Sequence, residues 1–255
     1  MQHGLPVLYT LLLWWFSTGV ILYLNGLPRR THKWTMLGTT VLLGVSMYEI
    51  GLSAADTQVG GAYAAFTAAL MVWAWQEVAF LLGYVTGPRR SACPPGALGW
   101  SRVGHAVMAI LYHELALVVL ASAILLMTWR QPNQIAVWTF SVLWIMRLSA
   151  KLNVFLGVRN LNEQFLPDHL RYMHSYFRQR PSNSLFPSSV IAATAAAAAV
   201  WESALAPLGS PFEAAGSSFV AMLLSLAVLE HWFMVLPLPS ERLWSWGMRS
   251  RESGT

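Results

Sequence analysis

The sequence predicts an all-α, polytopic membrane bundle of about seven transmembrane helices. Three observations predict it: 56% of the 255 residues are hydrophobic, the mean hydropathy is +0.49, and only 11% of the residues are charged. The 13 Trp residues supply amphipathic rings of the kind that anchor helices at the headgroup level. We therefore expect residues 1–255 to form a single membrane domain in contact with membrane lipid.

Each helix follows from a long apolar run, because a hydrocarbon core of about 30 Å requires roughly 20 such residues. The first run has no basic segment before it and no Ala-x-Ala site after it, so we expect a retained helix rather than a signal peptide. An Ala-rich stretch, residues 192–200, is typical of closely packed membrane helices. The expected helices are Leu5–Leu27, Trp34–Leu52, Ala62–Tyr84, Val103–Trp129, Ile135–Val158, Ser188–Leu208 and Phe212–Leu236.

The distribution of Lys and Arg predicts the orientation. Thirteen of the 16 basic residues fall in segments on one side of the expected helices, and only Arg130 falls on the other. The positive-inside rule then places the N-terminus in the periplasm and the C-terminus in the cytoplasm of a bacterial inner membrane. Because the basic residues are dispersed among loops, the net charge of +5 does not indicate nucleic-acid binding.

The longest polar segment, residues 159–187, joins the fifth and sixth helices on the expected cytoplasmic side. Pro167 and Asp168 can begin a helix, and Leu170, Met173 and Phe177 follow at helical spacing, which predicts a short amphipathic helix. Polar side chains of this density either hydrogen-bond within the segment or contact a partner. The candidates for partner binding are Arg159, Asn160, Asn162, Glu163, His169 and Arg171.

Ionisable residues also occur inside the expected helices, where burial in lipid is costly and function is the usual explanation. At 1.5 Å of rise per residue they lie at similar depths in the cytoplasmic half, so we expect them to converge. The candidates for metal or pigment ligands are Glu77, His113, Glu114, Glu230 and His231, and the candidate buried charge partners are Arg147 and Lys151.

Three chemistries fit this polar layer. Carboxylates and imidazoles are ligands for Fe, Mn or Zn, and a His can ligate the metal of a haem or of a bacteriochlorophyll-type tetrapyrrole. Alternatively, the acids form a salt-bridge network with Arg147 and Lys151. The sequence contains no Glu-x-x-His pair of the kind that di-iron bundles use. It also has no P-loop, nucleophile elbow or dinucleotide motif, so hydrolase and ATPase functions find no support.

The block from Lys151 to Val190 resembles the PuhE family of purple phototrophic bacteria, which is described as a photosynthetic complex assembly protein. The segments Tyr112-His113-Glu114-Leu115 and Leu229-Glu230-His231-Trp232 are similar to that family as well. The resemblance implies a role in producing the photosynthetic reaction centre and light-harvesting complex, through bacteriochlorophyll supply or delivery. The implied partners are reaction-centre or antenna subunits, or pigment-synthesis enzymes.

The hypothesis that follows is a non-enzymatic assembly factor in the intracytoplasmic (inner) membrane. One alternative is a membrane metalloenzyme that acts on a tetrapyrrole at the buried Glu and His layer. Another is a carrier of a pigment precursor, although the helices show no internal repeat of the kind common in transporters.

Overall fold

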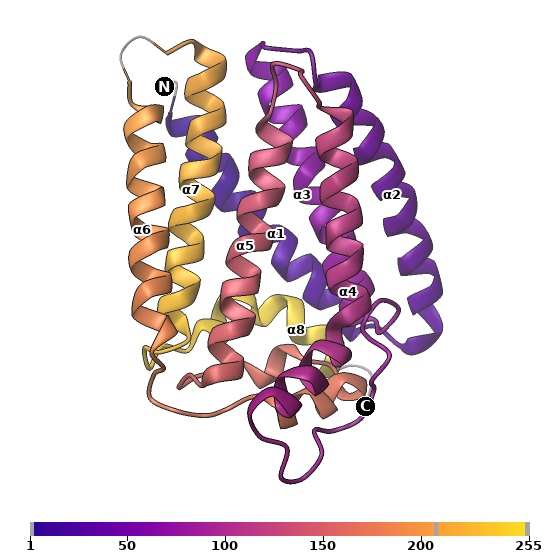
Figure 1. Ribbon diagram of the computed structural model, residues 1–255. Coiled ribbons are helices and arrows are strands. Elements are labelled where there is room, and N and C mark those ends of the chain that lie inside the picture. The colour runs from indigo at the N-terminus through magenta and orange to yellow at the C-terminus, as the bar shows by residue number, and fades with distance from the viewer. Residues whose placement is uncertain (1–2, 207–208, 253–255) are drawn as a thin grey trace.

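The computed structural model describes residues 3–206 and 209–252, and these form helices and no strand apart from an isolated bridge between Val158 and Gln179. Seven helices of this described part are long and apolar enough to cross a membrane, which confirms the predicted fold class (Figure 1). They are α1 Gly4–Gly26, α2 His32–Ser53, α3 Val59–Leu81, α4 Gly99–Met127, α5 Ile135–Leu156, α6 Leu185–Ala204 and α7 Pro211–Phe233. The shorter elements are η1 Arg29–Thr31, η2 Glu163–Phe165, η3 Asp168–Tyr176, η4 Ser240–Trp244 and α8 Ser245–Glu252.

The observed bounds differ from the expected ones by a few residues, and the start of α4 has an identifiable cause. The fourth helix begins at Gly99 rather than Val103, because the Arg102 guanidinium donates to the carbonyl oxygens of Phe155 and Tyr176 and is buried. A charged residue thus ends an apolar run without ending the helix. The expected end of the sixth helix, Leu208, lies outside the described residues.

The core of the bundle lies between α3 and α7, the two most buried helices. Phe66 of α3 stacks on Phe219 of α7 with 4.3 Å between ring centroids, and both side chains are fully buried. Tyr63 packs edge-on against Phe219 at 4.8 Å. The outer surfaces of α1, α2 and α4 carry exposed Leu, Val and Trp side chains, as expected of helices in contact with lipid.

The Ala-rich stretch of α6 packs against α7. Ala193 and Ala197 are buried, and Ala197 forms a cluster with Val220 and Leu224 of α7. Small side chains let the two backbones approach closely, which is the packing that the sequence predicts for this stretch.

Segments 82–98, 157–184 and 234–244 lie at one end of the bundle, here called the polar end (Figure 1). The amphipathic helix expected after Pro167 is present as the 3₁₀ helix η3. Its buried residues are Leu170, Met173 and Tyr176, at the spacing of three that a 3₁₀ helix places on one face. Leu170 and Met173 pack on Phe80 and Leu81 of α3, so η3 lies on the bundle itself.

One asparagine fixes the beginning of α6 on the end of α5. The Asn183 side-chain amide donates to the carbonyl oxygen of Asn153 at 3.2 Å and of Gly157 at 2.9 Å. Its oxygen accepts from the backbone of Leu185 and Phe186, which are the first residues of α6. These bonds satisfy backbone groups that a helix end leaves unpaired.

Part of segment 82–98 packs directly on the backbone of α4. The Arg89 amide donates to the carbonyl oxygen of Met108 at 3.2 Å, and the His113 amide donates to that of Thr86 at 2.9 Å. Gly87 lies between these two bonds, and a Cβ at this position would overlap the Met108 carbonyl. The close approach of the two backbones therefore requires glycine here.

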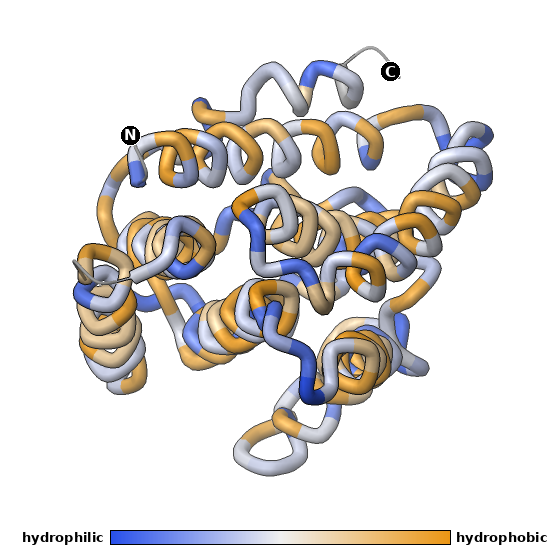
Figure 2. The backbone as a smooth tube through the Cα atoms, turned by 90° about the horizontal axis from the view of Figure 1, so that it is seen from above, coloured by the Kyte–Doolittle hydropathy of each residue, from blue (hydrophilic) through white to orange (hydrophobic). Residues whose placement is uncertain are grey.

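The segment after α7 returns along α1. Trp244 donates its indole N–H to the Trp15 carbonyl at 3.0 Å, and Ser250 donates to the Tyr23 carbonyl at 2.8 Å. Between these bonds the Trp246 ring lies on Gly19, where a Cβ would overlap it. Seen from above, α8 follows the outer side of α1 (Figure 2).

Candidate functional site

The first buried ion pair joins α3 to α5. Arg147 Nη2 donates to Glu77 Oε2 at 2.9 Å. The Glu77 side chain is 11% exposed, whereas that of Arg147 is 44% exposed. The carboxylate is therefore held inside the bundle by a cation that remains accessible from outside it.

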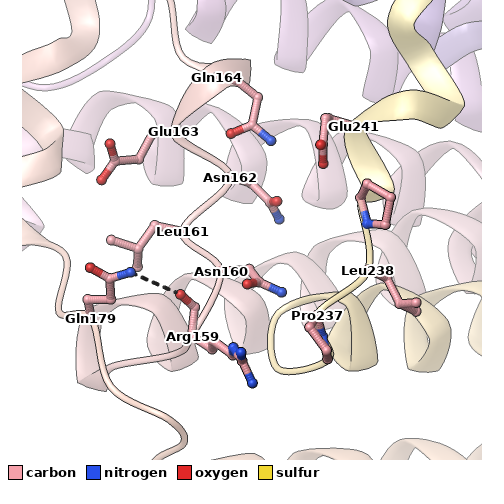
Figure 3. Close-up of a pocket in the computed structure, with 11 residues that line it drawn as sticks. Arg159, Asn160, Leu161, Asn162, Glu163, Gln164, Gln179, Pro237, Leu238 and Glu241 are labelled. Atoms are coloured by element: carbon pink, nitrogen blue, oxygen red, sulfur yellow. Dashed lines mark hydrogen bonds between the residues drawn. The ribbon is translucent and has the colours of Figure 1, made fainter.

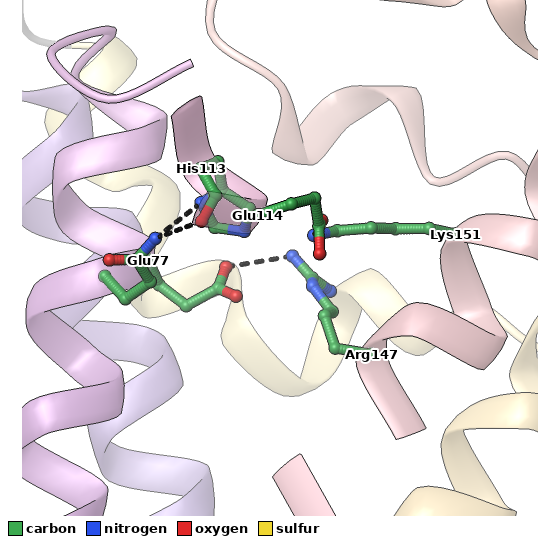
Figure 4. Close-up of polar contacts among 6 residues, drawn as sticks. Glu77, His113, Glu114, Arg147 and Lys151 are labelled. Carbon is green, nitrogen blue, oxygen red and sulfur yellow. Dashed lines mark hydrogen bonds and ion pairs between the residues drawn. The ribbon is translucent and has the colours of Figure 1, made fainter. Parts of the chain in front are cut away.

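A second ion pair lies one helical turn further along α5. Lys151 Nζ donates to Glu114 Oε1 of α4 at 2.6 Å, and each of these side chains is about a quarter exposed. Because Arg147 and Lys151 are four residues apart, they share one face of α5. Both cations thus reach toward acids on the neighbouring helices, and the two pairs lie next to each other (Figure 4).

His113 is held by a neutral partner beside these pairs. The Gln76 side-chain amide donates to His113 Nδ1 at 3.1 Å and to the His113 carbonyl oxygen at 2.9 Å (Figure 4). Nδ1 is therefore an acceptor, which is the arrangement of a neutral imidazole. The residue is 1% exposed and its ring lies 4.6 Å from that of Phe80.

Glu230 and His231 are consecutive on α7 and contact different helices. Glu230 Oε1 accepts the indole N–H of Trp14 on α1 at 2.7 Å. His231 Nδ1 donates to the Ala227 carbonyl at 2.8 Å, and its Nε2 accepts from the Ser149 hydroxyl of α5 at 2.9 Å. Both ring nitrogens of His231 are thus engaged.

The structure distributes the five ligand candidates over separate partners. Among the described residues, no group of three or more His, Cys, Asp or Glu side chains is placed to hold a metal ion. Around the ion pairs, the buried atoms Gln76 Oε1, Glu77 Oε1 and His113 Nε2 have no hydrogen-bond partner among the described residues. That His113 nitrogen could ligate a metal or pigment chemically, but a tetrapyrrole needs open space beside it and the residue is almost fully covered. The arrangement favours charge pairing between helices.

A surface cleft of about 540 Å³ lies at the polar end (Figure 3). Four of the six expected partner-binding residues line it: Arg159, Asn160, Asn162 and Glu163. Pro237, Leu238 and Glu241, from the segment after α7, form part of its wall. The cleft therefore joins two segments that are about 80 residues apart in the sequence.

These candidates differ in how much of each side chain is available. The Asn160 amide is used internally, since it donates to the carbonyl oxygens of Phe233 and Leu236 at the end of α7. Arg159 is exposed, and Glu163 is 53% exposed with His174 Nδ1 at 3.7 Å.

The remaining two candidates lie away from this cleft. Arg171 forms an exposed ion pair with Asp168 at 2.9 Å. His169 lines a second pocket at the polar end.

Comparison with known proteins places the chain in a family. A family model described as "Protein of unknown function (DUF3623)" matches residues 1–255. The chain belongs to the DUF3623 family. A relative from Rhodobacter capsulatus, named "Uncharacterized 30.4 kDa protein in puhA 5'region", is 41% identical over 254 residues, which cover 97% of this chain and 92% of the relative. No solved structure matches the chain.

Sequence reasoning missed the neutral partners in this DUF3623 chain. Gln76, Trp14 and Ser149 each bond one of the ionisable candidates, yet none of them is ionisable. Gln76 could have been noticed, because it is an amide in the middle of an apolar run and directly precedes Glu77. Trp14 and Ser149 are common in membrane helices and carry no comparable pattern.

Proposed function

We propose that this chain is a non-enzymatic assembly factor for the photosynthetic reaction centre and light-harvesting complex in the bacterial inner membrane. The observation that carries the proposal is the name of the 41% identical relative, which places that protein in the puhA 5' region. The resemblance of residues 151–190 to the PuhE family of assembly proteins supports it. Bacteriochlorophyll supply or delivery is the route that this resemblance implies.

The geometry is consistent with a protein that acts through its surface. Inside the bundle, the two cations of α5 are paired with acids of α3 and α4, so their role is to hold these helices together. At the polar end, Arg159, Asn162 and Glu163 line an accessible cleft. We propose this cleft as the contact site for a reaction-centre or antenna subunit or a pigment-synthesis enzyme. The Lys and Arg distribution supports a cytoplasmic location for this cleft.

Deletion of the gene in a phototrophic host tests the proposal. Membrane absorbance spectra should show less assembled reaction centre and antenna than in the parent strain. Unchanged complex and pigment spectra at matched growth would reject an assembly role.

Complementation with point variants tests the cleft. Arg159→Ala together with Glu163→Ala should accumulate normally in the membrane and fail to restore assembly, because both side chains are exposed at the cleft. Arg130→Ala, an exposed arginine at the other end of the bundle, is the matched control and should restore it. If the double variant restores assembly fully, the cleft is not the contact site.

Purification in mild detergent separates this proposal from an enzyme or a carrier. Absorbance and metal analysis of the same sample should show neither a stoichiometric metal nor a stoichiometric pigment precursor. A bound metal that is lost in Glu77→Gln or His113→Gln would instead favour the metalloenzyme.

A further inference from the structure

A second pocket at the polar end is formed by three segments that are far apart in the sequence. It has a volume of about 300 Å³ and lies where η1 precedes α2, where the chain leaves α3 and where η3 packs on the bundle. Its polar lining residues are Arg29, His32, Tyr84, Thr86, Arg90, His169 and Tyr172.

The pocket is lined by cationic groups and hydrogen-bond donors without a carboxylate. Arg29 and Arg90 supply guanidinium groups, and neither forms an ion pair with any described residue. The neighbouring acid, Asp168, is paired with Arg171 at 2.9 Å and points to the exposed surface. Uncompensated guanidinium groups that converge on a concave site are a common means of binding anions.

Buried polar groups in the same pocket retain unused hydrogen-bonding capacity. Thr86 is 1% exposed, and its hydroxyl lies beside that of Tyr172 with no other hydrogen-bond partner among the described residues. The His169 imidazole is hydrogen-bonded to the backbone of Leu81, and its buried Nε2 has no partner within the described part of the chain. Burial is the main cause that lowers the pKa of His169 and raises that of Tyr172, so both side chains are neutral groups at pH 7.

The backbone is shaped to keep this space open. Gly83 has a φ of +81°, and a Cβ at this position would lie 3.1 Å from the His169 ring. Any other residue would be strained here and would press on the imidazole. The Gly83 carbonyl oxygen accepts from Arg90 Nη2 at 3.2 Å, which holds that guanidinium at the pocket.

We propose that this pocket binds a phosphate group at the membrane interface. The guanidinium groups of Arg29 and Arg90 carry up to ten N–H donors, of which Arg90 Nη2 uses one on the Gly83 carbonyl, and this exceeds what the two oxygens of a carboxylate can accept, whereas a phosphate presents three or more acceptor oxygens. The pocket lies at the start of α2 and the end of α3, two helices long and apolar enough to cross a membrane, and lipid phosphates lie just outside the hydrocarbon core that such helices span. The phosphate could belong to a lipid headgroup or to a soluble compound, and the two sources are distinguished by experiment.

The test uses the purified full-length protein in two arms. In the first, inorganic phosphate is titrated and followed by calorimetry in detergent. In the second, the protein is placed in nanodiscs that contain phosphatidylglycerol or only phosphatidylcholine, and native mass spectrometry counts the lipids that it retains. Binding in the second arm alone identifies a lipid headgroup, and binding in the first arm identifies a soluble phosphate. No binding in either arm overturns the proposal.

The matched variants are Arg29→Gln and Arg30→Gln. Arg29 lines the pocket, whereas the adjacent Arg30 is exposed and does not. Loss of one charge-assisted hydrogen-bonding group should weaken binding at least about tenfold in Arg29→Gln, and Arg30→Gln should bind as the parent does. If both variants weakened phosphate binding equally, binding would depend on general surface charge, and the proposal would be overturned.

A conservative variant covers the case in which Arg29→Gln fails to fold. Arg90→Lys keeps the charge but loses the planar fork that binds two oxygens at once. It should fold as the parent does by circular dichroism and bind more weakly by several-fold. If the parent protein binds phosphate and Arg90→Lys binds it with the same affinity, the site does not depend on the planar guanidinium group, and the proposal is contradicted.

Discussion

Replacement of Arg147 by Met should destabilise the bundle by leaving Glu77 without its cation. Removing one partner of a buried ion pair costs about 3 to 5 kcal/mol, whereas an exposed pair contributes at most about 1 kcal/mol. Glu77 is buried, with a side chain 11% exposed, but that of Arg147 is 44% exposed, so we place the loss between these ranges, at about 2 to 3 kcal/mol.

The double variant distinguishes a lost pair from lost packing. Glu77→Gln combined with Arg147→Met removes both charges, so its stability should return to within about 1 kcal/mol of the parent. Lys151→Met is the comparison on the same helix face. Because its partner Glu114 is about a quarter exposed, it should lose less, about 1 to 2 kcal/mol.

Denaturant unfolding in detergent micelles measures these differences. The 13 Trp residues provide an intrinsic fluorescence change, and circular dichroism follows helix content in the same samples. If the losses of Glu77→Gln and Arg147→Met simply add in the double variant, the two side chains are not coupled and the ion-pair reasoning fails.

Three further predictions concern the backbone and the orientation. Gly87→Ala should destabilise the protein by about 3 kcal/mol in the same denaturant unfolding assay, because its Cβ overlaps the α4 backbone. Gly104→Ala, where a Cβ meets no atom within 4 Å, is the control and should be neutral or stabilising. Asn183→Ala should cost about 2 kcal/mol by freeing the first turn of α6, with faster hydrogen exchange at that turn as the check. A reporter fused after Thr255 should be cytoplasmic and one inserted near Asp56 periplasmic, and the reverse pattern would overturn the orientation.

The seven helices could be predicted from the sequence because each apolar run is long enough to specify a helix by itself. The end of a helix is less determined, since it depends on whether a polar group finds a partner. Arg102 shows this, because its carbonyl partners come from α5 and η3.

The partners of the buried charges could not be predicted from a local sequence pattern. Depth along a helix follows from the rise per residue, but pairing also depends on how each helix is rotated and which helices are neighbours. The spacing of Arg147 and Lys151 places them on one face of α5. Only the packing of the helices shows that Arg147 pairs with Glu77 and Lys151 with Glu114.

The proposed phosphate pocket could not be predicted from the sequence for a similar reason. Arg29, Arg90 and His169 come from segments separated by about 60 to 80 residues, and each appears in its own segment as an ordinary loop residue. Only the fold brings them together.

The contact between α8 and α1 can form only late in the synthesis of the chain. During synthesis α1 is made before α8, so its Gly19 surface is covered only when Trp246 has been made, more than 220 residues later. The contact between Gly19 and Trp246 cannot form before Trp246 has been synthesised. Until Trp246 and Ser250 have been made, α1 therefore remains incompletely packed on the side that α8 later covers.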